Sequence, residues 1–196
     1  MEIVLASGSP RRRQLLGELG WKFSVEPSRL KETAIAGESP ENMVCRLAET
    51  KAADVFSRRA SCWVIGADTV VVIDGRALGK PADSDEAVRM IELLQGRTHT
   101  VMTGVAVLAP DGRKLVRCEK TEVVFRQLSA EDARAYVAQG ESMDKAGAYA
   151  IQERGTLLVE RISGCYFNVV GLPLEALSEM FAELGWQLSE QWRGNR

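Results

Sequence analysis

A short segment near the N-terminus combines small residues with arginines where a helix should begin. Ser7-Gly8-Ser9-Pro10 follows an apolar run and precedes Arg11-Arg12-Arg13. Ser9 suits a helix N-cap and Pro10 the first helical position. Unpaired N–H groups at a helix start favour a phosphate and arginines add charge-assisted hydrogen bonds, whereas these cations oppose the dipole of a helix that binds nothing. The pattern predicts an anion site, with a solvated basic turn as the alternative.

Two further charged residues interrupt apolar patterns. Lys51 lies near the centre of the apolar arc of a helix predicted over residues 40–56. Asp68 breaks an apolar strand run at Gly66-Ala67-Asp68-Thr69. A buried carboxylate is costly unless it is paired, metal-bound or functional. The lysine therefore either aims its ammonium into a cleft or extends it to water, and the aspartate is either a site residue or a turn residue.

Weaker signals come from two later segments and from the only histidine. Gly79-Lys80-Pro81 would return a lysine to the same end of the sheet, and the segment from Asp144 to Gln152 combines small residues with an amide that can read a base edge. That segment fits a flexible loop equally well. A single histidine, His99, excludes a multi-histidine metal centre, so a cation would need oxygen ligands, which suits Mg or Mn. We expect His99 to be structural or exposed, and no nucleophile-elbow pattern supports a serine–histidine hydrolase.

The elements that must position these residues alternate between short apolar strands and amphipathic helices, which predicts a mixed α/β or α+β fold in one compact unit. Asp74-Gly75 predicts a hairpin turn, and Ser129 with Asp132 predicts a capping box. The tail over residues 187–196 is predicted to fray. The predicted strands cover residues 3–6, 63–73, 76–78, 99–108, 114–125, 156–162 and 166–169, and the predicted helices cover 10–19, 40–56, 84–94, 130–139 and the segment after Pro173.

Composition narrows the function classes. The 196 residues are 45% hydrophobic and 27% charged, with a formal net charge of -2. We therefore expect one globular domain over residues 1–196, as one body or two lobes, without the large basic field of a nucleic-acid binder. The four cysteines lack paired spacing, which favours reduced thiols over zinc or disulfides. The first apolar run is too short for a signal peptide or membrane span, so we expect a cytoplasmic protein with no membrane partner.

Six motifs in this order resemble the Maf family, also called septum-formation-inhibitor-like nucleoside triphosphate pyrophosphatases. Any one of them is weak evidence, but together they span nearly the whole chain and are highly specific. The last-but-one motif, followed by Ile151-Gln152, is similar to the branch that acts on dTTP and UTP rather than on 7-methyl-GTP. The motifs are Ser7-Gly8-Ser9-Pro10-Arg11-Arg12, Glu32, Gly66-Ala67-Asp68-Thr69, Gly79-Lys80-Pro81, Asp144-Lys145-Ala146-Gly147-Ala148-Tyr149 and Asn168-Val169-Val170-Gly171-Leu172-Pro173.

The resemblance implies a Maf/ITPase-like fold, in which a strongly curved mixed sheet is flanked by helices and an active-site cleft lies between two lobes. It also implies a nucleoside triphosphate substrate, a divalent metal (Mg or Mn) and commonly a homodimer. Asp68 would accept a proton from water, and with Glu32 it would hold the metal, so its two roles compete. The other catalytic residues implied are Ser7, Arg12, Glu32, Lys51 and Lys80, and those implied for base choice are Arg11, Thr69 and Gln152.

The sequence departs from the family pattern at three positions. Ala150 and Glu153 stand where family members often carry glycine, and Cys165 stands where serine is common. These changes put loop closure and base preference near Gln152 in doubt. Arg13 is not required by the motif, and a surface charge is enough to explain it.

Other functions stay open at this point. The same hydrolysis could act on 7-methyl-GTP or another modified nucleotide, and the loop at Gln152 would decide between them. A nucleotide-binding regulator of cell division would bind without turnover, but Asp68, Lys51, Lys80 and Glu32 together argue against pure binding. An unrelated phosphate-binding enzyme explains only the first motif. Removal of non-standard nucleotides is a hypothesis for the physiological role.

Overall fold

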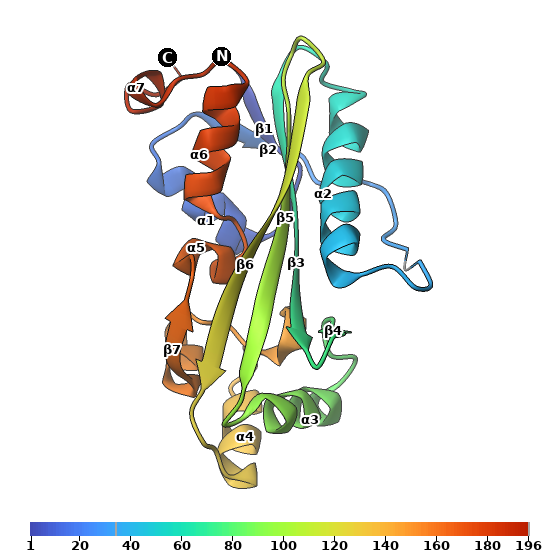
Figure 1. The fold of residues 1–196 in the computed structure, drawn as a ribbon, viewed down its shortest axis with the longest axis vertical. Helices are drawn as coiled ribbons and strands as arrows, with labels where there is room; N and C mark the ends of the chain where they lie inside the picture. Colours follow the sequence, from blue (N-terminus) through green and yellow to red (C-terminus); the bar gives the residue numbers. More distant parts are fainter. Residues whose placement is uncertain (34, 196) are drawn as a thin grey trace. The chain divides into compact units, whose positions relative to one another are not determined.

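The computed structural model describes residues 1–33 and 35–195, and its centre is a mixed seven-stranded sheet flanked by helices (Figure 1). The strand order is β2-β1-β3-β5-β6-β7, with β4 paired to β3. The pairs β1/β2 and β1/β3 are parallel, whereas β3/β4 and β6/β7 are antiparallel. The elements are β1 (Ile3–Leu5), α1 (Pro10–Glu18), β2 (Phe23–Val25), α2 (Pro40–Phe56), β3 (Trp63–Ile73), β4 (Arg76–Leu78), α3 (Ser84–Leu94), β5 (Thr98–Leu108), β6 (Lys114–Phe125), α4 (Ala130–Val137), the 3-10 turns η1 (Ala146–Ala148) and η2 (Glu153–Leu158), β7 (Val159–Ser163), α5 (Tyr166–Val170), α6 (Leu174–Glu183) and α7 (Leu188–Gln191).

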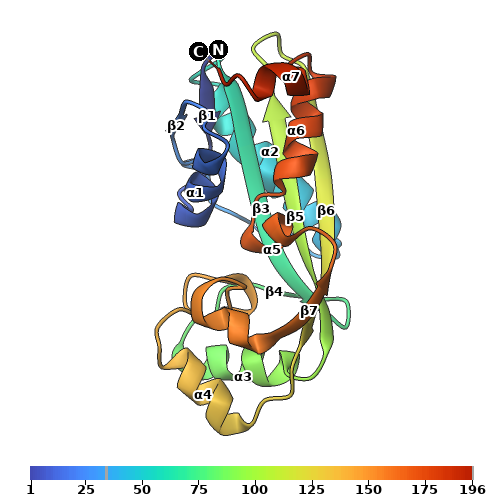
Figure 2. The ribbon, with the colours of Figure 1, turned by 90° about the vertical axis from the view of Figure 1, so that its left-hand side faces the viewer.

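The chain divides into two compact units. Unit 1 comprises residues 1–68, 103–119 and 171–196, and unit 2 comprises residues 69–102 and 120–170. The long strands β3, β5 and β6 contribute residues to both. Within unit 1, α2 and α6 cover opposite faces of the sheet (Figures 1 and 2). Within unit 2, α3 packs against α4 (Figure 2).

Local sequence signals account for most of these elements. Ser9 caps α1 and Pro10 opens it, Ser129 forms the predicted capping box of α4, and Asp74-Gly75 makes the β3–β4 hairpin with positive φ at both residues. The helix over 40–56 and the strands over 63–73, 76–78 and 114–125 have the predicted bounds. None of the four cysteines forms a disulfide in the described part of the chain. None of the helices in the described part of the chain is long and apolar enough to cross a membrane.

Two glycines allow α2 to lie directly on the sheet in unit 1. A Cβ at Gly66 of β3 would stand 2.2 Å from the carbonyl oxygen of Ala48, and a Cβ at Gly104 of β5 would stand 2.2 Å from that of Val44. Neither distance is possible for a real side chain, so both positions require glycine. The predicted apolar face of α2 is buried here: Val44, Leu47, Ala48, Ala52 and Val55.

Four predictions were wrong, and each error concerns a short segment. Residues 156–158, predicted as the start of a strand, belong to the 3-10 turn η2, and the strand β7 covers only Val159–Ser163. The segment at 166–169 is the helix α5 rather than a strand, because the buried amide of Asn168 donates hydrogen bonds to Val101 O (3.0 Å) and Thr121 Oγ1 (2.9 Å), contacts that override strand propensity. The three-residue strand β2 was not predicted.

The C-terminal tail, predicted to fray, contains α7 instead. Its Gln191 is buried, and Gln191 O accepts a 3.1 Å hydrogen bond from the indole of Trp21. Asn195 accepts from the backbone N–H of Lys22 at 2.7 Å and donates to the carbonyl of Met1 at 3.1 Å. These contacts within unit 1 order the tail up to residue 195.

Candidate active site

Arg12 is held in unit 1 by neutral oxygen acceptors. Its Nε donates to Gly171 O at 2.7 Å, and its Nη1 donates to Ala67 O at 2.9 Å and to Ser7 Oγ at 3.2 Å. Burial lowers the pKa of Arg12, while the negative charge of Asp68 opposes that effect. These three acceptors carry no formal charge, and they orient the guanidinium. Such a cation can bind a phosphate group.

Lys51 lies between two carboxylates. Its Nζ is 2.6 Å from Asp68 Oδ1 and 2.6 Å from Glu32 Oε1. The side chains of Lys51 and Asp68 are only 16% and 13% exposed, whereas that of Glu32 is 58% exposed. The lysine on the apolar arc of α2 therefore turns toward an acidic pair rather than toward water. The close packing at Gly66, two residues before Asp68, brings helix and strand near enough for this contact.

Asp68 combines burial with nearby positive charge. Burial raises the pKa of its carboxyl group, and Lys51 and Arg12 partly oppose this rise. A carboxylate with a raised pKa is a better proton acceptor than an exposed aspartate. The arrangement therefore provides a base beside two fixed cations.

Glu32 and Asp68 are the candidate ligands for a metal ion at this site. Across residues 1–33 and 35–195, no group of three or more His, Cys, Asp or Glu side chains is arranged to hold a metal. Glu32 Oε1 and Asp68 Oδ1 each lie 2.6 Å from Lys51 Nζ. The distance between these two oxygens is therefore at most the sum of the two contacts. Mg²⁺ is often bound by one or two carboxylates completed by substrate phosphates, so this pair fits such an ion when substrate is present.

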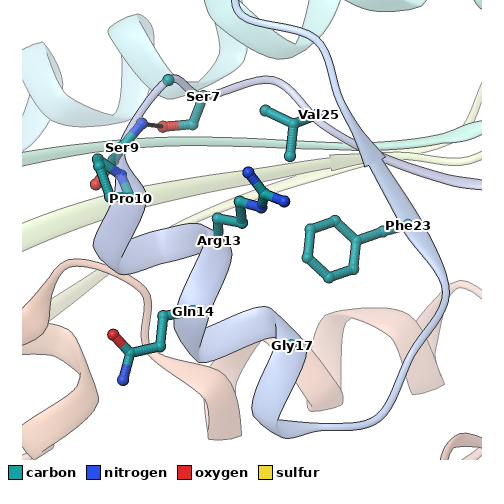
Figure 3. Close-up of a pocket in the computed structure, with 9 residues that line it drawn as sticks. Ser7, Ser9, Pro10, Arg13, Gln14, Gly17, Phe23 and Val25 are labelled. Carbon is teal, nitrogen blue, oxygen red and sulfur yellow. Dashed lines mark hydrogen bonds between the residues drawn. The ribbon is translucent and has the colours of Figure 1, made fainter.

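A cavity of about 430 Å³ opens beside the start of α1 (Figure 3). Ser7, a predicted site residue, lines it from the loop, and Arg13 extends across it toward Phe23 and Val25 of β2. Arg13 is one of the three arginines of the predicted anion site, although the family motif does not require it, and β2 was not predicted. A three-residue strand leaves too short a pattern to detect, so this wall of the cavity carried no usable sequence signal.

The other predicted residues occupy different positions. Arg11 lies in the first turn of α1, next to Arg12. Thr69, Lys80 and Gln152 belong to unit 2. In that unit, the backbone N–H of Gly147 donates to Gly79 O at 3.0 Å, which ties the loop before Gln152 to the residue before Lys80.

The loop over residues 144–155 depends on unusual backbone conformations. Gly147, Ala148 and Glu153 have φ of 67°, 62° and 53°, a left-handed region that favours glycine. At Glu153, where the family resemblance led us to expect glycine, this conformation places a side chain on a strained backbone. The hydroxyl of Tyr136 accepts a hydrogen bond from the N–H of Ala150 at 3.2 Å, which helps to fix the loop.

His99 is structural, one of the two outcomes expected for it. It is 2% exposed, its Nε2 is 2.7 Å from the hydroxyl of Tyr149, and its ring packs edge-to-face against Phe125. Burial lowers the pKa of His99 to about 4. The imidazole is therefore neutral at physiological pH and anchors the aromatic end of the loop.

The chain closely matches a known family. Residues 2–184 match the family described as Maf-like protein. A dTTP/UTP pyrophosphatase of Pelotomaculum thermopropionicum is 50% identical over 188 residues, covering 95% of this chain and 98% of that protein. A dTTP/UTP pyrophosphatase of Moorella thermoacetica is 51% identical over 185 residues, covering 94% and 95%.

A solved structure supports the fold. The HAM1 protein of Coxiella burnetii aligns with a TM-score of 0.53 over 93% of this chain and 99% of its own, at 16% sequence identity. That likeness concerns the fold alone. The family match covers residues 2–184 and therefore includes Arg12, Lys51 and Asp68. The chain belongs to the Maf-like protein family.

Proposed function

We propose that this protein hydrolyses nucleoside triphosphates between the α and β phosphates, with dTTP and UTP as substrates and a nucleoside monophosphate and pyrophosphate as products. Relatives that are about half identical over nearly their full length are named dTTP/UTP pyrophosphatases. The observation that carries the proposal is the cluster of Asp68, Lys51 and Arg12. It places a partly buried base beside two cations.

In the proposed reaction, a water molecule attacks the α-phosphorus and transfers a proton to Asp68. The bond between the α-phosphorus and the bridging oxygen breaks, and pyrophosphate leaves with the bond electrons. Arg12 and Lys51 stabilise the negative charge that is redistributed over the phosphate oxygens. Ser7 orients Arg12 through its hydroxyl, and Lys80 is proposed to supply a further positive charge.

Glu32 and Asp68 are the residues proposed to hold a Mg or Mn ion. When bound, the ion would neutralise charge on the phosphates and on the leaving pyrophosphate. Lys51 already contacts one oxygen of each carboxylate, so it keeps the two acidic groups together before an ion arrives. A carboxylate that binds metal is a weaker base, and the two proposed roles of Asp68 therefore compete.

Base choice is assigned to Arg11, Thr69 and Gln152. An amide such as Gln152 both donates and accepts hydrogen bonds and can therefore read a pyrimidine edge. The alternative substrate is 7-methyl-GTP or another modified nucleotide. Four further features stay predictions: a homodimer, a cytoplasmic location, an active-site cleft between lobes, and the lack of nucleic-acid or membrane partners.

The test is release of pyrophosphate from dTTP, UTP, CTP, GTP and 7-methyl-GTP, with Mg²⁺ or Mn²⁺, for the wild type, Asp68→Asn and the control Asp111→Asn. Loss of the base should lower kcat by about 10²- to 10⁴-fold. Asp111 lies in an exposed turn with its side chain 51% accessible, so its variant should match the wild type. Preference for 7-methyl-GTP would overturn the base assignment, and nucleotide binding without turnover would favour the division-regulator alternative.

A further inference from the structure

Glu32 lies on an exposed connection that has no regular structure of its own. Residues 26–39 join β2 to α2, and the described residues among them form no helix or strand. We call this segment the Glu32 strap. The side chain of Glu32 is 58% exposed. A segment of this kind is mobile unless other contacts fix it, so the 2.6 Å contact between Glu32 and Lys51 requires anchors elsewhere.

The first anchor is Arg46 on α2. Its Nη2 donates to Thr33 O at 3.0 Å, one residue beyond Glu32. The same guanidinium forms a two-point pair with Glu38, from Nε to Oε1 at 2.7 Å and from Nη2 to Oε2 at 2.6 Å. Hydrogen bonding to Arg46 lowers the pKa of Glu38. A two-point arginine–carboxylate pair fixes orientation as well as distance, so Arg46 joins two points of the strap to the helix.

The second anchor lies on the other side of Glu32. Asp54 Oδ2 accepts a 2.9 Å hydrogen bond from the backbone N–H of Arg29. Asp54 Oδ1 also pairs with Arg58 Nη1 at 2.8 Å, and Arg58 Nε pairs with Glu26 Oε1 at 2.9 Å. The beginning of the strap is therefore fixed to the C-terminal end of α2.

The contacts follow one another in order along the helix. Strap residues 29, 32 and 33 meet helix residues 54, 51 and 46, so the strap runs antiparallel to α2. From residue 46 to residue 54 the helix axis advances about 12 Å, and an extended chain from residue 29 to residue 33 can reach about 13 Å. The strap therefore follows α2 in the opposite direction, with Glu32 between its two anchors.

We infer that Arg46 is a positioning residue which, by holding Thr33 O and Glu38, keeps Glu32 at Lys51 for the reaction. Asp54 performs the same task from the other side. The inference rests on the proposed function for its effect on catalysis, but the anchoring itself does not. Arg46 makes no hydrogen bond to Asp68, and although its charge also acts on that carboxylate, most of its effect on kcat should pass through Glu32.

The kinetic test compares Arg46→Met, Glu32→Gln and the double variant in pyrophosphate release from dTTP. Arg46→Met should lower kcat about tenfold to hundredfold, since a displacement of about 1 Å can cost that much, and KM should change less. Added to Glu32→Gln, the same substitution should change kcat less than about twofold, because groups that act through one another are not additive. Arg97→Met is the control: it removes the Arg97–Asp74 pair of unit 2, in which Nη2 donates to both carboxylate oxygens, and it should leave kcat unchanged.

A second measurement does not depend on activity. The strap contains two trypsin sites, after Arg29 and Lys31, and mass spectrometry can follow their cleavage in the folded protein. Arg46→Met should speed cleavage there about tenfold, while Arg97→Met should not. Glu38→Gln weakens the same anchor with little change of shape and serves if Arg46→Met does not fold.

The outcomes separate the two proposals. If the wild type hydrolyses no nucleotide, the proposed function fails, and protease sensitivity still tests the anchor. If the wild type is active and Arg46→Met has the same kcat, Arg46 is not a positioning residue. The same holds if the decrease in kcat caused by Arg46→Met adds fully to the decrease caused by Glu32→Gln. Unchanged cleavage after Arg29 and Lys31 would overturn the anchor itself.

Discussion

The predicted site residues in the two units are held in different ways. In unit 1, Ser7, Arg12, Lys51 and Asp68 lie on or beside long elements. Side-chain contacts join Ser7 to Arg12 and Lys51 to Asp68, and Arg12 also donates to the carbonyl of Ala67, the residue before Asp68. In unit 2, the loop before Gln152 depends on left-handed backbone and on neutral aromatic contacts around His99 and Tyr149. Charges are therefore placed by rigid elements, and the loop by local conformation.

This difference suggests how each region responds to change. Removing one charge in unit 1 leaves an opposite charge poorly compensated in a partly buried place, which is costly. A change in the loop of unit 2 alters backbone strain or packing, for which typical effects are smaller. The following predictions test the contrast, from the largest expected effect to the smallest.

Apart from loss of the base Asp68, Lys51→Met should be the most damaging substitution. It removes the ammonium between Asp68 and Glu32, so the pKa of Asp68 should rise further and transition-state charge should lose a partner. We expect kcat to fall by about 10²- to 10³-fold. Lys114→Met is the control, because Lys114 pairs with Glu49 at an exposed position, where its side chain is 59% accessible. Steady-state kinetics on both variants measures this. An equal decrease in kcat for Lys51→Met and Lys114→Met would contradict the special role of the partly buried lysine.

His99 should make unit 2 sensitive to acid. Its folded-state pKa of about 4 lies below the unfolded value of about 6.5, so the unfolded chain binds more protons between these values. The free energy of unfolding should therefore be highest above pH 6.5. It should fall by about 3 kcal/mol as the pH is lowered toward 4.

Urea unfolding of the wild type and His99→Gln across this pH window measures the effect. Glutamine can keep a hydrogen bond to Tyr149 but does not titrate, so the difference in unfolding free energy should depend on pH only between about 4 and 6.5. A difference that is constant with pH would contradict the neutral, buried imidazole.

Gly66→Ala should harm stability and activity together. A new Cβ would press on the carbonyl of Ala48 and push α2 away from β3, which separates Lys51 from Asp68. Overpacking of this kind costs about 1 to 3 kcal/mol. Gly17→Ala is the control, since no atom lies within 4 Å of its Cβ position and alanine favours a helix by about 0.5 to 1 kcal/mol. Thermal unfolding and kcat should both separate the two variants.

Glu153→Gly should have the smallest effect. Its φ of 53° strains a residue with a side chain by about 1 to 2 kcal/mol, but glycine also gains entropy in the unfolded chain. We expect a net stabilisation below about 1 kcal/mol, with kcat on dTTP within about twofold of the wild type. Denaturation curves and kcat on dTTP measure these two effects. A clear decrease in the free energy of unfolding would show that Glu153 makes a contact that stabilises the fold by more than the backbone strain destabilises it.

The sequence by itself determined the local parts of this protein. Helix caps at Ser9 and Ser129, the Asp74-Gly75 turn and the apolar periodicity of α2 depend on neighbouring residues, so their elements were predicted with nearly correct bounds. The same patterns marked Lys51 and Asp68 as charges in apolar positions. The family resemblance supplied the roles of the remaining site residues.

Only the tertiary structure decided which groups meet. The short elements β2, α5 and α7 form because distant residues hydrogen-bond or pack against them, and such brief segments have little intrinsic preference of their own. Lys51 reaches Asp68 because Gly66 and Gly104 let α2 lie on the sheet, and Glu32 joins them because Arg46 and Asp54 hold its strap. These contacts join residues far apart in the chain, so no local pattern could reveal them.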